Sequence, residues 1–364
     1  MAANGSTVLD HGVVLRALRS KTTTLSLDNT KIDALPPSLT KLTFLTKFSA
    51  KNNSLTDHGL SPTLKSLTKL CAINLGCNKL SCLPVCFMEM PELQNIHLFS
   101  NEIEQLDEDV LECLTEVIVL NLNGNLIDHL PPAIASLNNL TTLGIASNRL
   151  KFLPQEISHL SSLVELHVED NQLQHLPSGI SQLKKLTRIY AQKNKLQSLN
   201  PLISCCTSLR VLDISSNQIQ FFPQELGEMK LREFHYELNP LIPFIPIPSS
   251  ATEEVLPLKE LICRRLFTIL ENDSRLEVIV QSLPEVRDAL AQAGKCLVCD
   301  GPFVNSWLEC VKFIQAKKII LPLRSPSGLI PIRIMLCSYK CLNSGDHDYY
   351  GIATPPSTND IFVK

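Results

Sequence analysis

The chain has 364 residues, of which 44% are hydrophobic and 19% charged, and its formal net charge is −3. This near-neutral balance excludes a broad electrostatic attraction to nucleic acid or to anionic membranes. No stretch approaches the ~18 uncharged apolar residues of a membrane span, and residues 1–10 lack the apolar run of a signal peptide. We therefore expect no contact with a membrane.

The thirteen cysteines are odd in number, and the first seventy residues contain none. Secreted repeat proteins usually seal their ends with disulfide-rich caps, because oxidising compartments favour disulfides. The N-terminal flank cannot supply such a cap here. The cysteines therefore indicate reduced thiols in an intracellular protein, with the cytoplasm as its expected location.

The chain begins with a short segment that is expected to be a helix. Within residues 8–19, Val14, Leu15 and Leu18 have helical spacing. A stack of repeats exposes an apolar end unless another element covers it. Residues 1–21 are therefore predicted to form an N-terminal helical cap.

A repeat of 22 to 25 residues follows over residues 22–242, with the pattern LxxLxxLxLxxNxL. One copy contains Leu137, Leu140, Leu143, Ile145 and Asn148. The same asparagine recurs in a fixed frame, with Thr30 in that frame ahead of the others: Asn53, Asn78, Asn101, Asn125, Asn148, Asn171, Asn194, Asn217 and Asn239. Ten registered copies indicate a solenoid.

The spacing of the repeat explains how each coil forms. Residues two apart, such as Leu143 and Ile145, lie on one face of a short strand, and we expect them to point inward. The asparagine amide can donate and accept, so it can satisfy backbone groups in its own turn and in the next one. Each group left unpaired would cost roughly 1–3 kcal/mol. The asparagines are therefore predicted to form a structural ladder.

These motifs resemble the leucine-rich-repeat family, and the 23-residue copies are similar to those of Ras-suppressor-like intracellular proteins. The resemblance implies an α/β leucine-rich-repeat solenoid of about ten repeats, with a parallel sheet on its concave face that binds proteins. Helical caps and a small C-terminal module with cysteine pairs complete the expected fold.

The exposed strand positions are the candidate partner-binding residues. Most are small and polar, so aromatic and charged exceptions are informative, since such side chains on a rigid face are typical interface hot spots. The central column is expected to run Ser26, Ser49, Asn74, His97, Asn121, Gly144, His167, Tyr190, Asp213 and His235. The candidates are His97, Phe99, Glu165, His167, Glu169, Asp170, Arg188, Tyr190, Lys193, Asp213 and His235.

The repeat pattern ends in a proline-rich segment, NPLIPFIPIPSS, which starts at Asn239. Residues 243–293 are predicted to hold this boundary and a helical C-terminal cap, with helices near 256–270, 275–282 and 285–293. Residues 343–364 are predicted to be a flexible tail.

The first of these helices resembles the box with which substrate receptors of cullin ubiquitin ligases bind elongin. Pro257, Leu258 and Leu266 fit that pattern, but Ile262 stands where the family has cysteine, and Cys263 follows one position late. In the alternative interpretation, which this departure favours, the apolar residues form the buried stripe of a cap: Leu258, Leu261, Ile262, Leu266 and Leu270.

Residues 294–342 contain two short cysteine pairs, Cys296 with Cys299 and Cys337 with Cys341. Expected strands lie between them, in LECVKFI and IPIRIML. Two thiol pairs on the turns of a hairpin can hold zinc tetrahedrally, which predicts a zinc-ribbon-like module with a structural zinc ion. Ordinary reduced cysteines and a redox pair remain alternatives.

No nucleotide, hydrolase or zinc-protease motif is present, so we expect no enzymatic activity. The whole layout, including LKELICRRL, CLVC and CSYKC, resembles short animal leucine-rich-repeat proteins of the leucine-rich repeat-containing protein 58 type. The sequence favours a non-catalytic protein-binding scaffold or adaptor. One alternative is a ubiquitin-ligase receptor that binds elongin and a cullin. Another, less favoured, is a nucleic-acid-binding zinc ribbon with these basic residues: Lys312, Lys317, Lys318, Arg324 and Arg333.

Overall fold

The computed structural model describes residues 6–242, 258–272, 286–287, 290, 293–304, 307–319, 328–344 and 347–351. These residues belong to two compact units. The first contains the repeats up to Pro240, together with a short segment around Ile319. The second contains Gln220–Gly227 and most of the chain after Leu241.

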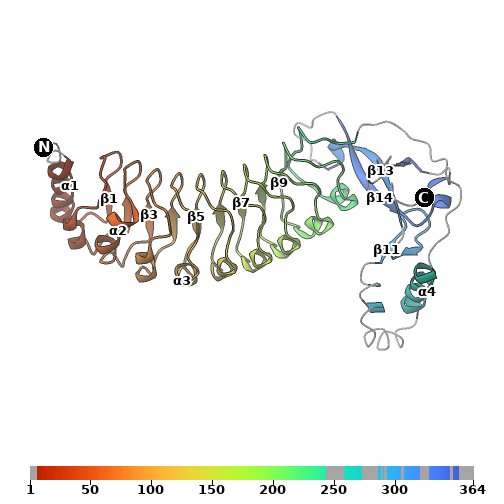
Figure 1. The fold of residues 1–364 in the computed structure, drawn as a ribbon, viewed down its shortest axis with the longest axis horizontal. Coiled ribbons are helices and arrows are strands. Elements are labelled where there is room, and N and C mark those ends of the chain that lie inside the picture. Colours follow the sequence, from red (N-terminus) through yellow and green to blue (C-terminus); the bar gives the residue numbers. More distant parts are fainter. Residues whose placement is uncertain are drawn as a thin grey trace, which may run out of the picture. The chain divides into compact units, whose positions relative to one another are not determined.

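The repeats build one parallel sheet of ten three-residue strands in chain order (Figure 1). The strands are β1 (Thr24–Ser26), β2 (Lys47–Ser49), β3 (Ala72–Asn74), β4 (Asn95–His97), β5 (Val119–Asn121), β6 (Thr142–Gly144), β7 (Glu165–His167), β8 (Arg188–Tyr190), β9 (Val211–Asp213) and β10 (Glu233–His235). Each strand pairs with the next one along the chain. This sheet confirms the predicted solenoid.

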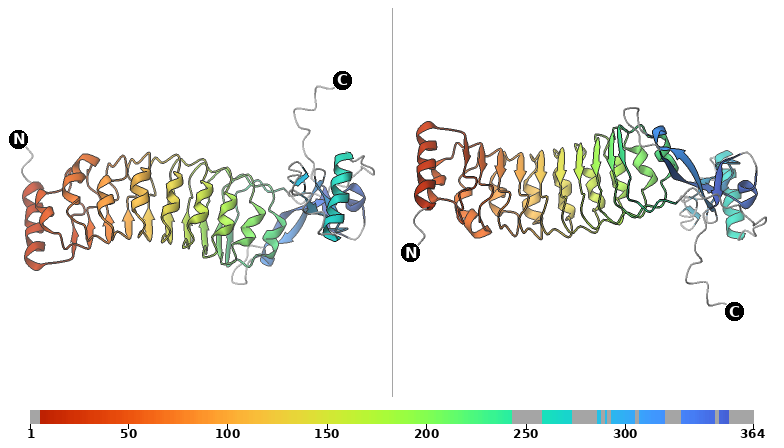
Figure 2. Two further views of the ribbon diagram at one scale, coloured as in Figure 1. Left: turned by 90° about the horizontal axis from the view of Figure 1, so that it is seen from below. Right: turned by 90° about the horizontal axis from the view of Figure 1, so that it is seen from above.

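The return segments form short helices on the side opposite the strands, as the two views of Figure 2 show. Several begin after a proline, which cannot donate a hydrogen bond and suits a helix start. They are η1 (Pro37–Lys41), α2 (Asp57–Leu64), η2 (Val85–Glu89), α3 (Glu108–Cys113), η3 (Pro132–Ser136), η4 (Gln155–His159), η5 (Ser178–Gln182), η6 (Pro201–Cys205) and η7 (Gln224–Glu228).

The repeat leucines fill the space between the strands and the return segments. In the sixth repeat Leu137, Leu140, Leu143 and Ile145 are fully buried, and the equivalent positions of repeats two to nine are buried in the same way. Burying a side chain of this size contributes about 1.5–3 kcal/mol. Each coil therefore has its own core layer, and stacked coils share one continuous core.

The asparagine ladder forms, and Asn171 is a representative member. Its Nδ2 donates to the carbonyl of Val168 in its own repeat and to that of Ile145 in the preceding repeat. Its Oδ1 accepts from the backbone N–H of Leu150, also in the preceding repeat. We expected each amide to bind backbone groups of its own turn and of the following turn. The prediction of the following turn was wrong, because each amide binds its own repeat and the preceding one.

A positive φ occurs at the residue before each of the nine ladder asparagines and before Thr30, which has the same place in the first repeat. Only Gly124 among these ten positions is a glycine, with φ 68°. The others are Asn29, Asn52, Cys77, Ser100, Ser147, Asp170, Lys193, Ser216 and Leu238. The chain turns sharply at this residue, so that the following asparagine side chain can enter the core. The repeat pattern LxxLxxLxLxxNxL leaves this position unspecified and so does not predict the positive φ.

The first helix, α1 (Ser6–Ser20), covers the N-terminal end of the repeats, as expected. Val14 and Ala17 are buried, whereas Leu15 is half exposed. The prediction that Leu15 helps to seal the first repeat was therefore wrong. The buried positions are three apart, so the helix is turned to place Val14 and Ala17 against the core.

The second unit contains α4 (Leu258–Asn272), the hairpin strands β11 (Gly294–Lys295) and β12 (Pro302–Phe303), and α7 (Tyr339–Leu342). Its main sheet has the order β14 (Leu329–Leu336), β13 (Leu308–Gln315), β15 (Tyr349–Gly351) and is antiparallel. The short helix η9 (Ala316–Lys318) follows β13. Strand β15 lies within residues 343–364, so this part of the expected flexible tail is an ordered strand.

Strand β14 has a second neighbour within the same unit. Phe222 donates its backbone N–H to the Pro331 carbonyl, and its own carbonyl accepts from Arg333. The Arg333 guanidinium lies over the ring of Phe221. The segment Gln220–Gly227 thus extends the sheet of the C-terminal unit. The predicted helix at 275–282 and Pro257 lie outside the described residues.

Candidate binding face and cysteine cluster

The central column of exposed strand positions is aligned across all ten strands. Pairing places Ser26 beside Ser49, and the register continues without a slip to Asp213 beside His235. The intermediate pairs follow the same frame. The candidates of this column therefore share one face of the first unit.

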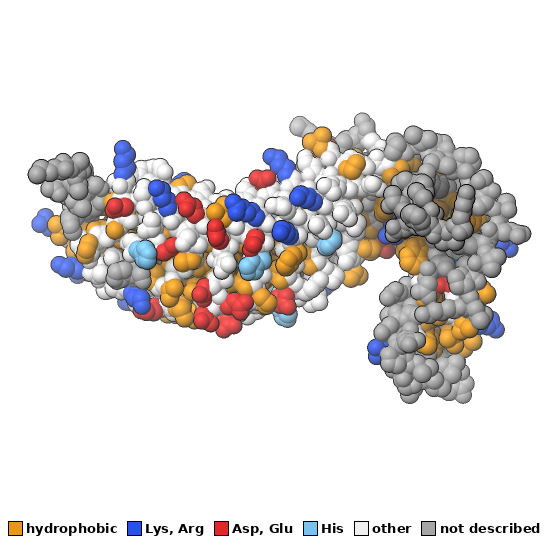
Figure 3. Space-filling model, in the orientation of Figure 1, with side chains coloured by type: hydrophobic (Ala, Val, Ile, Leu, Met, Phe, Trp, Pro, Cys, Tyr) orange, Lys and Arg blue, Asp and Glu red, His pale blue; other side chains and the backbone are white. Residues whose placement is uncertain are grey.

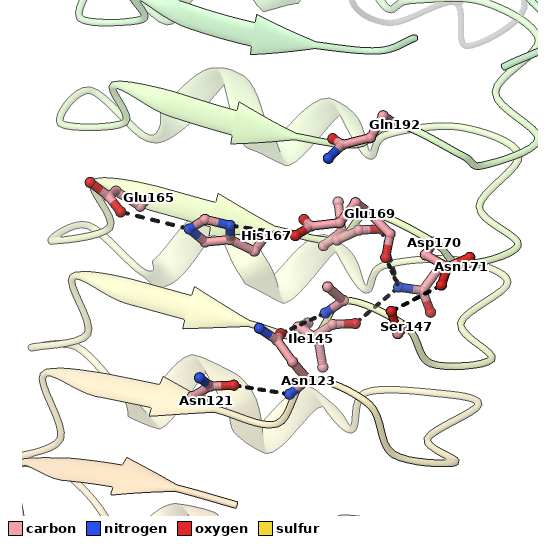
Figure 4. Close-up of polar contacts among 12 residues, drawn as sticks. Asn121, Asn123, Ile145, Ser147, Glu165, His167, Glu169, Asp170, Asn171 and Gln192 are labelled. Atoms are coloured by element: carbon pink, nitrogen blue, oxygen red, sulfur yellow. Dashed lines mark hydrogen bonds and ion pairs between the residues drawn. The ribbon is translucent and has the colours of Figure 1, made fainter. Parts of the chain in front are cut away.

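The densest group of candidates lies on β7 and β8, and Figure 4 shows the members Glu165, His167 and Glu169 from the first of these two repeats. The His167 ring stacks on the ring of Tyr190, with 4.7 Å between centroids and 18° between planes. The carboxylates of Glu165 and Glu169 flank the imidazole, at 3.6 Å from Nε2 and 3.7 Å from Nδ1. Glu165 also pairs with the Arg188 guanidinium. We call these five residues the β7–β8 cluster.

The carboxylates change the proton affinity of His167. The hydrogen bond with Glu169 raises the pKa of His167 above its ordinary value of 6.5, with a further contribution from Glu165, although burial opposes the increase. In contrast, burial lowers the pKa of His97. The pKa values of these two histidines of the same column are therefore shifted in opposite directions, and the carboxylates around His167 favour its cationic form.

Phe99 is partly covered by its own chain. Its ring occupies the space over Gly76, where an added Cβ would come within 2.5 Å of the ring. The Lys51 ammonium lies 5.2 Å from the centroid of the same ring. Because Gly76 has no side chain, the Phe99 ring can pack directly against the backbone at Gly76, and the Lys51 cation lies over this ring. Phe99 offers less free aromatic surface than its position in the sequence suggested.

Asp170 and Lys193 lie beyond the strands, in the turn with positive φ. Asp170 accepts from the Ser147 hydroxyl across the repeat boundary at 2.9 Å (Figure 4). Asp213 stays on the face, but its carboxylate accepts from the backbone and hydroxyl of Ser215. His235 is exposed near Glu233. The structure therefore does not bring all of the candidates into one group.

Charge is not confined to the sheet face. Figure 3 shows acidic side chains gathered near α3, where Glu108, Asp109 and Glu112 lie on the outer surface. Charge alone thus does not distinguish a binding face from solvated surface. The β7–β8 cluster differs because its charged groups surround a stacked aromatic pair.

The four predicted metal ligands come together in the second unit. The sulfurs of Cys296, Cys299, Cys337 and Cys341 all lie within 4.8 Å of one another. Cys337 Sγ lies 3.5 Å from that of Cys299 and 3.6 Å from that of Cys341. Zinc with Zn–S bonds of about 2.3 Å would place tetrahedral sulfurs about 3.8 Å apart. Two of the sulfur separations lie near this value, and all four sulfurs are close enough together to surround one ion.

Each cysteine pair is held by a turn. Between β11 and β12, Cys296 donates to the Gly301 carbonyl, and Asp300, with φ 56°, donates to the Cys296 carbonyl. The Gly301 N–H points at Cys299 Sγ, at 3.4 Å. The second pair lies at the end of β14 and on α7, which Ser338 caps by accepting from the Cys341 N–H. Both turns direct their sulfurs to one point.

The thiols differ in how readily they ionise. Burial acts to raise the pKa of Cys296, but backbone N–H groups, chiefly that of Cys337, lower it to about 7. Burial raises the pKa values of Cys337 and Cys341. One thiolate is therefore favoured without a cation, whereas several together require a positive charge among them.

The helix with the elongin-like pattern is α4, and its burial differs from the buried stripe that the cap interpretation predicted. Ile262 and Leu261 are each 50% exposed, so they are not part of a buried stripe. Leu266 is half-buried, and for Leu258 only the backbone is described. The residues of α4 that are buried are Glu260 and Cys263. Neither the structure nor the comparisons below support an elongin or cullin partner.

Two of the basic residues suggested for nucleic-acid binding, Lys312 and Arg333, form ion pairs within the second unit. Lys312 pairs with Asp348 at 3.1 Å and lies over the Tyr349 ring. Arg333 pairs with Glu309. Lys318 is exposed, and Arg324 lies outside the described residues. The nucleic-acid alternative therefore has no support in this geometry.

The ten-stranded sheet and the comparisons together define the fold of the first unit as a leucine-rich-repeat solenoid. Residues 117–241 match the family model described as a leucine-rich repeat region. A leucine-rich-repeat protein of Leptospira interrogans has a similar structure, with TM-score 0.50 and 28% identity over 57% of this chain and 59% of that one. The functional domain of InlJ from Listeria monocytogenes has TM-score 0.53 at 24% identity, over 62% and 46%, which shows likeness of fold.

Curated relatives include leucine-rich repeat-containing protein 69. The mouse protein is 37% identical over 135 residues, which are 37% of this chain and 39% of that protein. The human protein is 36% identical over 125 residues. The matched part thus spans about two fifths of the mouse relative. These comparisons leave the narrower resemblance to the Ras-suppressor and protein 58 types as a prediction. None of the described helices is long and apolar enough to cross a membrane.

Proposed function

We propose that the protein is a non-catalytic, intracellular scaffold or adaptor that binds a protein partner on the sheet face of its repeats. The main support for this proposal is the β7–β8 cluster, in which a stacked His167–Tyr190 pair is surrounded by charged side chains. Aromatic and arginine side chains on a rigid surface are where interface free energy concentrates. The ten aligned strands supply that rigidity.

Two buried acceptor atoms without hydrogen-bond partners among the described residues, one of them in the β7–β8 cluster, support this part of the sheet face as the binding site. Glu169 Oε2 and Gln192 Oε1 are buried atoms with no hydrogen-bond partner among the described residues. They lie on adjacent repeats, since the Asp170 N–H donates to the Gln192 carbonyl. Buried acceptors without donors are rare in folded proteins, because they lose their contact with water. Rotation of these two side chains would bring the oxygens to the surface, where backbone or cationic N–H groups of a partner would donate to them.

The test compares two charge reversals in one repeat. Arg188 lies on the sheet face in β8, whereas Lys185 is exposed in the preceding turn. The full-length protein, Arg188→Glu, Tyr190→Ala and Lys185→Glu would each be used for affinity purification followed by mass spectrometry. We expect a partner that Lys185→Glu retains and that the other two lose, with affinity reduced about 30-fold. A partner retained by all three variants contradicts the assigned face.

We propose secondly that the four clustered thiols hold one structural zinc ion. The sulfur spacing and the two turns that aim the thiols at one point support this, and four thiolates leave no open coordination position for catalysis. Bound zinc stabilises such small modules by on the order of 10–16 kcal/mol. Elemental analysis of the purified protein should find one zinc per chain. Less than a tenth of that amount after growth with added zinc would refute the site.

A further inference from the structure

Helix α4 buries a charged side chain and exposes two neighbouring apolar ones. Glu260 is 1% exposed, whereas Leu261 and Ile262 are each 50% exposed. An ordinary amphipathic helix at a protein surface has the opposite arrangement. Burying a carboxylate is costly unless it is paired and hydrogen-bonded. The contacts of Glu260 must therefore explain why α4 packs in this orientation.

Glu260 and Arg264 join both cysteine turns. Glu260 Oε1 accepts from Arg264 Nε at 2.6 Å and from the backbone N–H of Val304 at 2.8 Å. Val304 directly follows β12, which closes the first turn. Arg264 Nη2 donates to the carbonyl of Cys337, in the second turn, at 3.1 Å. One ion pair thus contacts two segments that the chain places more than thirty residues apart.

His347 also contacts the backbone of the cysteine cluster. His347 Nε2 lies 2.7 Å from the Cys341 carbonyl, and its Nδ1 accepts from the Tyr349 N–H. Since a carbonyl only accepts, Nε2 carries the proton of this hydrogen bond. The carbonyls of two of the four cysteines are therefore held by residues outside the turns. Such outer contacts orient metal ligands and strengthen metal binding.

We infer that Glu260 and Arg264 are positioning residues of the metal site, and that metal binding holds α4 against the module. This inference rests on the proposed zinc ion. The ion would fix the two turns relative to each other. With the turns fixed, the Val304 N–H and the Cys337 carbonyl lie where Glu260 and Arg264 can bond to them at the same time. Without the ion the buried carboxylate would lose a partner, so α4 would separate and the presentation of Leu261 and Ile262 would change.

The first experiment needs no substitution. Hydrogen exchange of residues 258–272 is measured on the full-length protein with zinc and after its removal by a chelator, with the ladder repeats as internal reference. Trp307 is the sole tryptophan of the chain, and its ring lies 5.9 Å from that of Phe303 in β12, so its fluorescence reports on the module. We expect exchange in α4 to rise at least tenfold on zinc removal, together with a change in fluorescence, while the repeats stay protected.

The second experiment compares neighbouring arginines on one helix. Arg264→Met removes the contact with Cys337, and Arg265→Met changes an exposed side chain. Zinc transfer to a coloured chelator should be 10–100-fold faster for Arg264→Met and unchanged for Arg265→Met. Arg264→Lys should partly restore the slow rate, and the cobalt-loaded protein should keep its tetrahedral thiolate spectrum in all variants. Two results would overturn this inference but leave the zinc site intact. One is a chain that binds one zinc ion but whose α4 exchanges at the same rate after zinc removal. The other is an equal rate of zinc transfer from Arg264→Met and Arg265→Met. A chain that binds no zinc overturns the metal site as well.

Discussion

His167 stacks on Tyr190 across two neighbouring strands, with 4.7 Å between the ring centroids, and both imidazole nitrogens face carboxylates. The hydrogen bond with Glu169 is the main cause of the raised His167 pKa. A group whose pKa is higher in the folded than in the unfolded chain stabilises the fold below the unfolded value. That contribution disappears as the pH rises through the folded pKa.

We therefore predict that the stability difference between the protein and His167→Gln is largest below pH 6.5 and shrinks as the pH rises above that value. Urea unfolding at a series of pH values would measure it, and NMR titration should give a His167 pKa above 6.5. Substitution of exposed His159, which hydrogen-bonds within its own turn, is the control. A difference that grows with pH would contradict the assigned ion pairs.

The ladder gives a prediction for stability. Asn171→Ala removes three donated hydrogen bonds and one accepted hydrogen bond. It leaves backbone groups of four residues without this partner: Ile145, Val168, Glu169 and Leu150. We expect a loss of about 3 kcal/mol, since each unpaired buried group costs about 1–3 kcal/mol. Asn138→Ala, at an exposed turn, should change the unfolding free energy by less than about 0.5 kcal/mol. Equal effects in urea unfolding would argue against the ladder.

The turn before each ladder asparagine gives a paired prediction. At Gly124, with φ 68°, an added Cβ would meet Ser100 Oγ at 3.4 Å, an ordinary contact. Gly124→Ala should therefore cost about 1 kcal/mol through backbone strain alone. At Leu238, with φ 58° and 82% exposure, Leu238→Gly should instead stabilise by about 0.5 kcal/mol. Opposite signs in thermal unfolding are the required result, and a loss of stability for both variants would exclude left-handed strain as the cause.

The cysteine cluster predicts which thiols determine metal content. Cys296→Ser should reduce bound zinc to less than a tenth of one equivalent, because a neutral hydroxyl replaces the thiolate ligand. Cys113 is exposed on α3, so Cys113→Ser should retain the full amount. Elemental analysis of both proteins measures this. Equal zinc in the two variants would show that the metal binds elsewhere.

The repeat frame was predictable in detail because it depends on local spacing. Asparagines 22 to 25 residues apart and paired apolar positions determined ten strands in register, and the central column from Ser26 to His235 followed. The four cysteines were also recognisable as one group, since short thiol pairs imply turns that direct two sulfurs together.

Other features depended on contacts that no local pattern encodes. Leu15 and Ile262 have helical spacing suited to burial, yet they are exposed, because the neighbouring elements contact other sides of their helices. The ring of Phe99 packs over Gly76, and the ammonium group of Lys51 lies over the same ring. Strand β15 forms because Tyr349–Gly351 find a partner in β13, which is far away in sequence.

The amino-acid sequence by itself determined the coil, its leucine core, its asparagines and the candidate metal ligands, since each follows from residues close together in the chain. Tertiary structure decided which candidates meet: His167 with Tyr190, and Glu260 and Arg264 with the two cysteine turns. The physical reason is that side-chain pairing and burial depend on distances between separate segments, which are set only when the whole chain has packed.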